Sequence, residues 1–189
     1  MRISLAQSGH IARKIAIEIA NNSTIFIEKN MDQLAEVAQT IIEDDLKWEK
    51  SIEERVTQII ENQVRQERER TIEYDYANDR EIFAMIKKKI AKDEDFPMNF
   101  EDRFDQLSYN ILDEFLDQSL ISFNAPKPFV KNIIFDAIQQ YLKEKVLIED
   151  IVAKKIRNFK RKLIQGTDEY DEVYQQLFET ELRARGFQK

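Results

Sequence analysis

MDQLAEVAQTIIEDDLKWEKSIEERVTQII (residues 31–60) carries apolar side chains at three- and four-residue spacing within an acidic background. A second stretch, KPFVKNIIFDAIQQYLKEKVLIEDIVAKKI (residues 127–156), aligns with it position by position. Most of the matched positions are apolar, so both stretches preserve the same buried face. The sequence therefore predicts two long amphipathic helices. The matched apolar pairs include Leu34 with Val130, Ile42 with Ile138, Leu46 with Leu142, Ile52 with Ile148 and Val56 with Val152.

The similarity continues upstream of both stretches. STIFI (residues 23–27) and SLISF (residues 119–123) stand at the same distance before the two long helices. Both are too short for a helix and rich in β-branched or aromatic residues, which favours strands. We expect Ile25–Ile27 to pair with Ile121–Phe123 in a two-stranded ribbon. Because helical periodicity does not explain this second match, we interpret the chain as an internal duplication.

Each copy is expected to form three helices, which makes the fold all-α. The expected helices cover residues 5–20, 31–67 and 79–92, then 104–118, 128–163 and 168–185. We divide the chain into a first helical repeat (1–92), a charged linker (93–102) and a second helical repeat (103–189). The periodicity predicts the following inward side chains: Ile59 and Gln63; Ile82, Met85, Ile86 and Ile90; Phe159 and Leu163; Tyr174, Leu177, Phe178 and Leu182.

Composition limits the class of protein. The 189 residues are 34% charged with a net charge of -7, and they include three Gly, three Pro and no Cys. Few helix breakers favour long helices. The lack of Cys excludes disulfides, thiolate chemistry and Cys-based zinc sites. No segment approaches the roughly 20 apolar residues that span a bilayer, and the N-terminal segment does not resemble a signal peptide. We expect a soluble cytoplasmic protein without a membrane partner.

A basic segment lies at the end of the second long helix, in VLIEDIVAKKIRNFKRKLIQGT (residues 146–167). Its six cations are Lys154, Lys155, Arg157, Lys160, Arg161 and Lys162. They can meet the helix dipole and pair with acidic side chains of the other copy, such as Glu43 and Asp44. They can also bind the phosphates of a nucleic acid, with Tyr170 as a stacking platform. Binding to an anionic membrane surface is the least favoured interpretation, because no second membrane anchor accompanies the basic segment.

Catalytic and metal-binding patterns are missing from the sequence. The consecutive acids Glu43, Asp44 and Asp45 do not share one helix face, and the single His, His10, has no Glu three residues before it. There is no nucleophile motif and no glycine-rich phosphate loop. We therefore expect no enzyme activity, metal or cofactor. Trp48 interrupts an acidic helix, where it either anchors a protein interface or packs across onto another helix.

The C-terminal part resembles a known family. Its pattern is a basic helix end, a Gly-Thr pair, an acidic-aromatic pair and an aromatic-rich helix ending in Glu-Leu and Gly. Here these elements are Lys160, Arg161 and Lys162; Gly166 and Thr167; Glu169 and Tyr170; Tyr174 and Phe178; Glu181, Leu182 and Gly186. The chain is similar to an uncharacterised bacterial family, domain of unknown function five-hundred-and-seven, apparently in two tandem copies. The first copy departs from the pattern, because ERTIEYDYANDRE (residues 69–81) has no Gly at its turn. The resemblance implies a soluble bacterial helical protein and assigns no activity.

Two functions follow as hypotheses. The leading one is a cytoplasmic adaptor or scaffold that binds another protein through helical surfaces, motivated by long amphipathic helices and segregated charge. The alternative is an RNA-, DNA- or ribosome-associated protein that uses the basic segment. A homo-oligomer is also compatible with the sequence.

Overall fold

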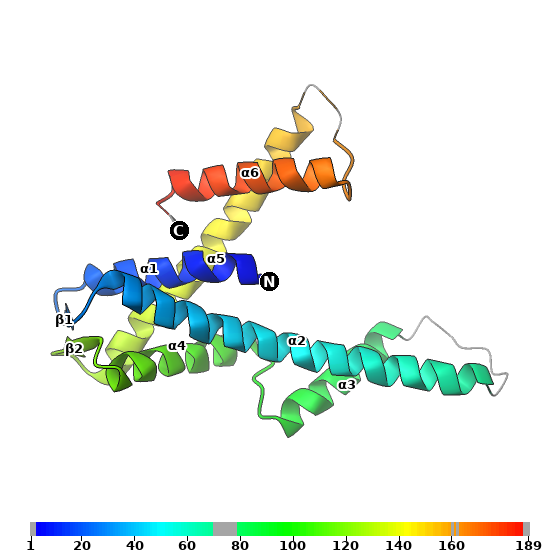
Figure 1. Ribbon diagram of the computed structural model, residues 1–189, viewed down its shortest axis with the longest axis horizontal. Coiled ribbons are helices and arrows are strands. Elements are labelled where there is room, and N and C mark those ends of the chain that lie inside the picture. Colours follow the sequence, from blue (N-terminus) through cyan, green and yellow to red (C-terminus); the bar gives the residue numbers. More distant parts are fainter. Residues whose placement is uncertain (1–2, 70–78, 160, 162, 187–189) are drawn as a thin grey trace.

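The computed structural model describes residues 3–69, 79–159, 161 and 163–186, and these residues form an all-α fold with one small ribbon, as expected (Figure 1). Nothing is described of the side chains of residues 64–69 and 79. In chain order the elements are a short 3-10 helix η1 (Leu5–Gln7), α1 (Ser8–Ala20), β1 (Ile25–Ile27), α2 (Met31–Glu69), α3 (Asp79–Asp93), α4 (Phe100–Asp117), β2 (Ile121–Phe123), α5 (Lys127–Arg157) and α6 (Asp168–Ala184).

The ribbon pairs the two predicted strands and confirms their positions. Strands β1 and β2 are antiparallel, with Phe26 opposite Ser122 at the centre. On one side the Glu28 N–H donates to the Leu120 carbonyl at 2.9 Å, and on the other the Asn124 N–H donates to the Thr24 carbonyl at 3.0 Å. The sequence alignment matches Glu28 with Asn124 and Thr24 with Leu120, so exchanging the halves of the chain turns one hydrogen bond into the other. The ribbon thus has the pattern of an approximate two-fold axis.

Helices α1, α2, α4 and α5 enclose the part of the main core that lies beside the ribbon. Helix α1 packs on α2 and α5, and α4 packs on α5 and α2, so the same contacts recur when the halves are exchanged. Apolar side chains spaced four residues apart give α1 and α4 one buried face each. These buried positions also match between the halves: Ile11 with Leu107, Ile15 with Ile111 and Ile19 with Phe115.

Helices α2 and α5 extend beyond this four-helix part, and each packs against one further, shorter helix there (Figure 1). We call α3 with the part of α2 that contacts it the first arm, and α6 with the part of α5 that contacts it the second arm. The first arm has an apolar cluster of its own, formed by Ile52, Val56, Ile90, Ala91 and Phe96. In the second arm Phe178 and Leu182 belong to the main core. The two arms diverge, so α3 and α6 lie far apart.

Two apolar positions expected to face inward in the first arm are exposed. Met85 is 69% exposed, while Phe83 packs against the cluster in its place. Lys87 faces α2, where it reaches two carboxylates, and this orientation turns Met85 to the outside. On α2, Ile60 packs inward, whereas Ile59 and Gln63 are exposed. An α-helix drifts by about 20° per heptad relative to a strict seven-residue repeat, which moves the buried stripe.

Helix α5 ends at Arg157, earlier than the expected residue 163. Asn158 has a non-helical backbone with φ -90° and ψ 3°, and Phe159, expected to be inward, is 45% exposed. The chain turns back here so that α6 can bury its apolar face on α5. Gly166, with φ +88°, takes the left-handed conformation that the turn requires, and the Thr167 hydroxyl caps α6 by accepting the Tyr170 N–H at 3.3 Å.

Helix α4 begins inside the expected linker. Asn99 caps it by accepting the Glu101 N–H at 3.0 Å, and Phe96, just upstream, is buried. In α6, the inward positions are confirmed: Phe178 and Leu182 are buried, and Tyr174 and Leu177 are half-buried. Across the described ranges, none of the helices combines the length and the apolarity that crossing a membrane requires.

Candidate protein-interaction site

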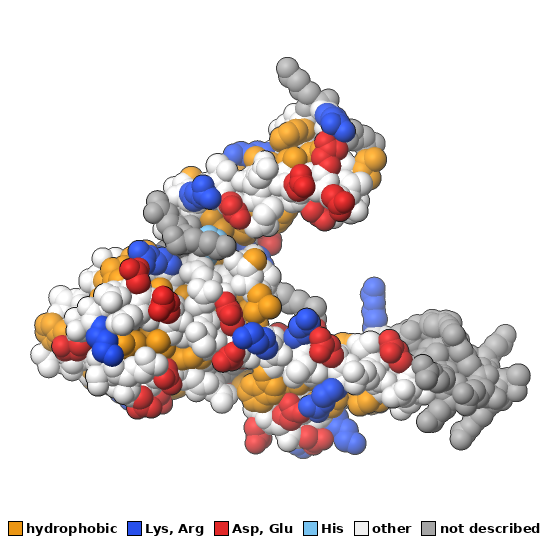
Figure 2. Space-filling model, viewed as in Figure 1, with side chains coloured by type: hydrophobic (Ala, Val, Ile, Leu, Met, Phe, Trp, Pro, Cys, Tyr) orange, Lys and Arg blue, Asp and Glu red, His pale blue; other side chains and the backbone are white. Residues whose placement is uncertain are grey.

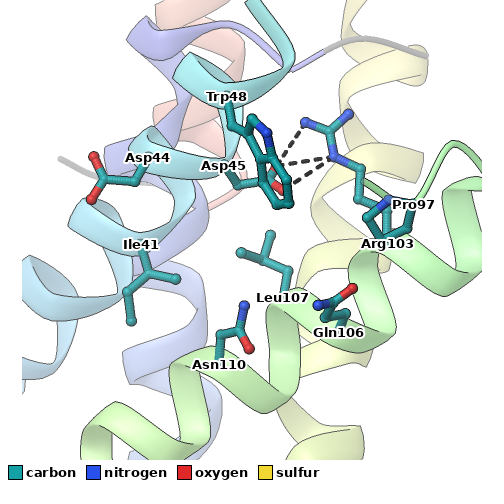
Figure 3. A pocket seen from close by; sticks show the side chains of 9 residues that line it. All are labelled: Ile41, Asp44, Asp45, Trp48, Pro97, Arg103, Gln106, Leu107 and Asn110. Atoms are coloured by element: carbon teal, nitrogen blue, oxygen red, sulfur yellow. Dashed lines mark hydrogen bonds and ion pairs between the residues drawn. The ribbon is translucent and has the colours of Figure 1, made fainter. Parts of the chain in front are cut away.

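A pocket of about 240 Å³ lies between α2 and α4, beside the segment that joins α3 to α4 (Figure 3). We call it the Trp48 pocket. Residues of α2 and α4 form most of its walls, and Pro97 closes one end. The lining residues are Ile41, Asp44, Asp45, Trp48, Pro97, Arg103, Gln106, Leu107 and Asn110.

The indole of Trp48 is held in place by residues of the segment that follows α3. Its Nε1–H donates to the Glu94 carboxylate at 2.9 Å, and Glu94 also pairs with Arg55. The ring packs edge-on against Phe96, with centroids 4.9 Å apart and planes at 82°. The sequence allows two interpretations of Trp48, an anchor for a protein interface or packing within the chain. These contacts are of the second kind, and they are made with the segment that follows α3. The ring nevertheless remains half-buried and forms part of the pocket wall.

Arg103 ties α4 to α2 at the edge of the pocket. Its guanidinium donates to Asp45 Oδ2 from Nε at 3.0 Å and from Nη2 at 2.6 Å, and to Glu49 Oε2 from Nη1 at 2.6 Å. It also lies 4.8 Å from the ring centroid of Phe96, within cation–π range. Asp45 and Glu49 are four residues apart, so both carboxylates share the face of α2 that meets α4. Because these groups are largely shielded from solvent, the pairs are stronger than surface ion pairs.

A lysine extends this network to α3. Lys87 Nζ donates to Glu49 at 3.0 Å and to Glu53 at 2.6 Å. Burial opposes ionisation of Glu49, but hydrogen bonds from Arg103 and Lys87 outweigh it and lower the pKa of this carboxyl. Burial raises the pKa of Asp45, although Arg103 opposes the rise. The network thus fixes three helices around the pocket through interacting charges.

The pocket also presents polar groups that the protein itself leaves open. The side-chain amides of Gln106 and Asn110 line the α4 side, across from Trp48 (Figure 3), and have no hydrogen bond to any described residue. Asp44 is exposed and pairs with Lys47 at 3.0 Å. The pocket therefore combines apolar lining from Ile41 and Leu107, a fixed aromatic wall and a rim with two open amides.

The predicted basic segment lies at the far end of the second arm, away from this pocket. Lys155 pairs with Glu181 at 2.5 Å, and Arg161 pairs with Glu169 at 3.0 Å. Both acids belong to α6, so the expectation that these cations pair with acids of the other copy is wrong for these two residues. The fold explains this difference, since α6 returns along α5 and brings its own carboxylates within reach.

The remaining residues of the segment differ in their surroundings. Lys154 and Arg157 are exposed and have no acidic partner among the described residues. Lys160 and Lys162 lie outside the described residues. Tyr170 is half-buried and stacks on Tyr174 with centroids 6.3 Å apart, so its ring joins the packing of α6.

Sequence reasoning found Trp48 but missed its neighbours Arg103, Gln106 and Asn110. One signal was present in the sequence. Asp45 and Glu49 are four residues apart on an otherwise inward-facing part of a helix, which indicates a cation on the facing helix. The pairing residue lies more than fifty positions away in the chain, and periodicity carries no information about such a distant partner.

Among the residues that the structure describes, no group of His, Cys, Asp and Glu side chains could hold a metal ion.

Comparison with known proteins places the chain in a family. No curated protein matches the sequence. One family matches, described as protein of unknown function (DUF507), and the match covers residues 1–187. Because this single match includes both halves of the helical fold and the Trp48 pocket between α2 and α4, the chain belongs to the DUF507 family.

Proposed function

We propose that this protein is a non-catalytic, cytoplasmic adaptor or scaffold that binds another protein, and that the Trp48 pocket receives one side chain of that partner. The observation that carries the proposal is the fixed indole of Trp48 facing two amides that have no partner in the described chain. We also propose that the halves of the chain are copies of one helical unit. The matched ribbon hydrogen bonds support this.

The pocket suits a single side chain better than a free small molecule. Its volume of about 240 Å³ is below the range of about 300–1,000 Å³ that is typical of small-molecule sites. Trp is enriched among the residues that dominate binding energy at protein interfaces. Contacts with Glu94 and Phe96 already hold the Trp48 ring in place. The side chain therefore loses little conformational entropy when a partner binds.

The lining favours a lysine or arginine of the partner. Ile41 and Leu107 offer apolar contact to an aliphatic stem, and the face of the Trp48 indole attracts a cation. The amide oxygens of Gln106 and Asn110 supply two acceptors, whereas the Asp44 carboxylate beside the rim already pairs with Lys47. Arg103 does not repel such a cation strongly, because Asp45 and Glu49 already neutralise it.

The test uses the protein as bait for its partner in a bacterial lysate, with half of each sample treated with nuclease. Asn110→Arg places a long cation at the pocket rim on an exposed helix position, so the fold is retained. The matched control is Asn132→Arg, an exposed position on α5 outside the pocket. We expect mass spectrometry to find the same partner with the wild type and the control in both halves, and its loss with Asn110→Arg. Partners that disappear from the wild-type sample after nuclease treatment would contradict the proposal.

Exposed Lys154 and Arg157 support a second candidate, a nucleic-acid- or ribosome-associated protein. Each phosphate that they neutralise would release counterions and make binding salt-dependent. The ion pairs of Lys155 and Arg161 with α6 leave fewer cations for this role. The distinguishing measurement is RNA affinity at two salt concentrations, with Lys154→Glu/Arg157→Glu against the wild type. Equal affinities would remove this candidate.

A further inference from the structure

Two apolar side chains stand out on the surface. Met85 is 69% exposed and Ile164 is 66% exposed, the highest values among the large apolar side chains that the structure describes. Exposed apolar side chains are common individually, but lysines follow Met85 along its helix face and acids follow Ile164 at the next helix. Met85 lies on the first arm, in α3, and Ile164 lies in the connection between α5 and α6, four residues before α6 begins.

Cations follow Met85 on the outer face of α3, and the exposed Glu81 lies one turn before it. Lys88, Lys89 and Lys92 follow it at three-, four- and seven-residue spacing, so all four side chains share one helix face. The three lysines are exposed and have no ion pair with any described residue. The preceding Lys87 differs, because it turns inward to Glu49 and Glu53. We call this face, Met85 with Lys88, Lys89 and Lys92, the α3 surface.

Acids follow Ile164 in the first turns of α6. The Ile164 carbonyl accepts the Thr167 N–H at 3.3 Å and the Thr167 hydroxyl at 2.8 Å, which fixes it beside the first turn of the helix. Asp168, Asp171 and Glu172 follow, exposed and without an ion pair to any described residue, and Figure 2 shows acidic side chains gathered over α6. The nearby Arg161 is neutralised by Glu169 at 3.0 Å. We call Ile164 with Asp168, Asp171 and Glu172 the α6 surface.

One chain cannot bring its own two surfaces together, because α3 and α6 lie on diverging arms (Figure 1). We propose that the α3 surface of one copy docks on the α6 surface of a second copy. Met85 and Ile164 then form the apolar centre, and the lysines face the carboxylates around it. If the second copy returns the same contact, a closed dimer with two equal interfaces results. This inference is independent of the Trp48 pocket.

The exposed apolar side chains Met85 and Ile164 favour a second copy of the chain over a nucleic acid as the partner. Three lysines alone would suit phosphates, but an apolar centre with a charged rim is the usual arrangement of a protein–protein interface, in which Met is enriched. Helix dipoles favour acids at the start of α6 and cations near the end of α3, but they give no reason to expose Met85 and Ile164.

The test is the molar mass of the full chain in solution at low and high salt, measured by light scattering. We expect a species heavier than one chain at low salt that dissociates at high salt, where the Debye length falls to about 3 Å at 1 M. The variants Lys88→Glu/Lys89→Glu and Asp171→Lys/Glu172→Lys should each associate at least about ten-fold more weakly, because like charges then face each other. Their mixture should regain the heavier species, since each reversed surface then meets a complementary one.

The matched control for Lys88→Glu/Lys89→Glu is Lys29→Glu/Lys143→Glu, which makes the same charge change at exposed positions outside both surfaces. It should associate as the wild type does. Circular dichroism of every variant separates lost association from lost folding. A wild type with the mass of one chain at every salt concentration would overturn the inference. So would a heavier species that neither reversal affects, or an RNA affinity that Lys88→Glu/Lys89→Glu abolishes while the mass stays unchanged.

Discussion

In the first arm, Lys87 holds α3 to α2 by donating to Glu49 and Glu53, whereas in the second arm Phe178 and Leu182 hold α6 to α5 as part of the main core. The apolar cluster of the first arm is separate from that core. The second arm has ion pairs too, between Lys155 and Glu181 and between Arg185 and Glu144, but they add to apolar packing that is already continuous with the core.

This difference shows that one arrangement of helices can be stabilised in two ways. A helix that shares the main core should open only when the whole protein unfolds, while a helix on a separate cluster can open by itself. We therefore expect α3 to exchange its amide hydrogens faster than α6. The predictions below test this comparison, in decreasing order of expected effect.

The largest expected effect follows from Phe178→Ala. Removing this buried ring leaves a cavity in the main core, which costs about 3–5 kcal/mol of unfolding free energy. Urea unfolding followed by circular dichroism should show one transition at a lower midpoint, because α6 and the core unfold together.

The matched change in the first arm is Ile90→Ala, which removes a buried side chain from the separate cluster. Hydrogen exchange should then show faster opening of α3 with little change in the main urea midpoint. If Ile90→Ala instead lowers that midpoint as much as Phe178→Ala does, the arms do not differ in cooperativity.

Arg103→Met should have the next largest effect. The variant keeps apolar cover over Phe96 but leaves Asp45 and Glu49 without their main cation, which costs about 3 kcal/mol, the low end for breaking a buried pair. Lys155→Met, its counterpart at a half-exposed ion pair of the second arm, should cost less than about 1 kcal/mol. Urea midpoints of the two variants provide the comparison.

The triple variant Arg103→Met/Asp45→Asn/Glu49→Gln separates charge from packing. It removes the stranded carboxylate charges, so it should recover part of the lost free energy. Absence of any recovery would mean that the packing of Arg103, and not its charge, stabilises the contact between α2 and α4.

Local patterns in the sequence were enough to predict the ribbon and the inner face of α6. The pieces STIFI and SLISF match at one offset, and Phe178 and Leu182 follow helical spacing. Met85 was assigned wrongly because α3 has apolar residues on two faces, and the distant acids Glu49 and Glu53 decide which face turns inward through Lys87.

The end of α5 and the Trp48 pocket depend on long-range packing in the same way. The helix ends at Arg157 because α6 has to return along α5, a condition that the residues before Phe159 do not encode. The pocket needs Arg103 opposite Asp45, a contact between separate helices. The pair Asp45 and Glu49 shows that a cation is required on the facing helix without showing which residue supplies it.

Acidification should produce the smallest effect, and it should act first on the first arm. Hydrogen bonds from Trp48 and Arg55 lower the pKa of Glu94, and those from Arg103 and Lys87 lower the pKa of Glu49 against the effect of burial. A carboxyl whose pKa is lower in the folded state stabilises the fold above its unfolded pKa, here near 4.5, and this stabilisation is lost as the pH falls below that value.

Asp45 acts in the opposite sense, because burial raises its pKa and the folded state therefore takes up its proton more readily than the unfolded state. Its protonation offsets part of the loss from Glu49 and Glu94, which is why the expected effect is small. Hydrogen exchange below pH 4.5 should show α3 opening before α6, and Glu49→Gln should reduce the pH dependence of that opening. Equal opening of both helices would mean that the charges of the first arm do not set its stability, and that its separate apolar cluster holds α3 as firmly as the main core holds α6.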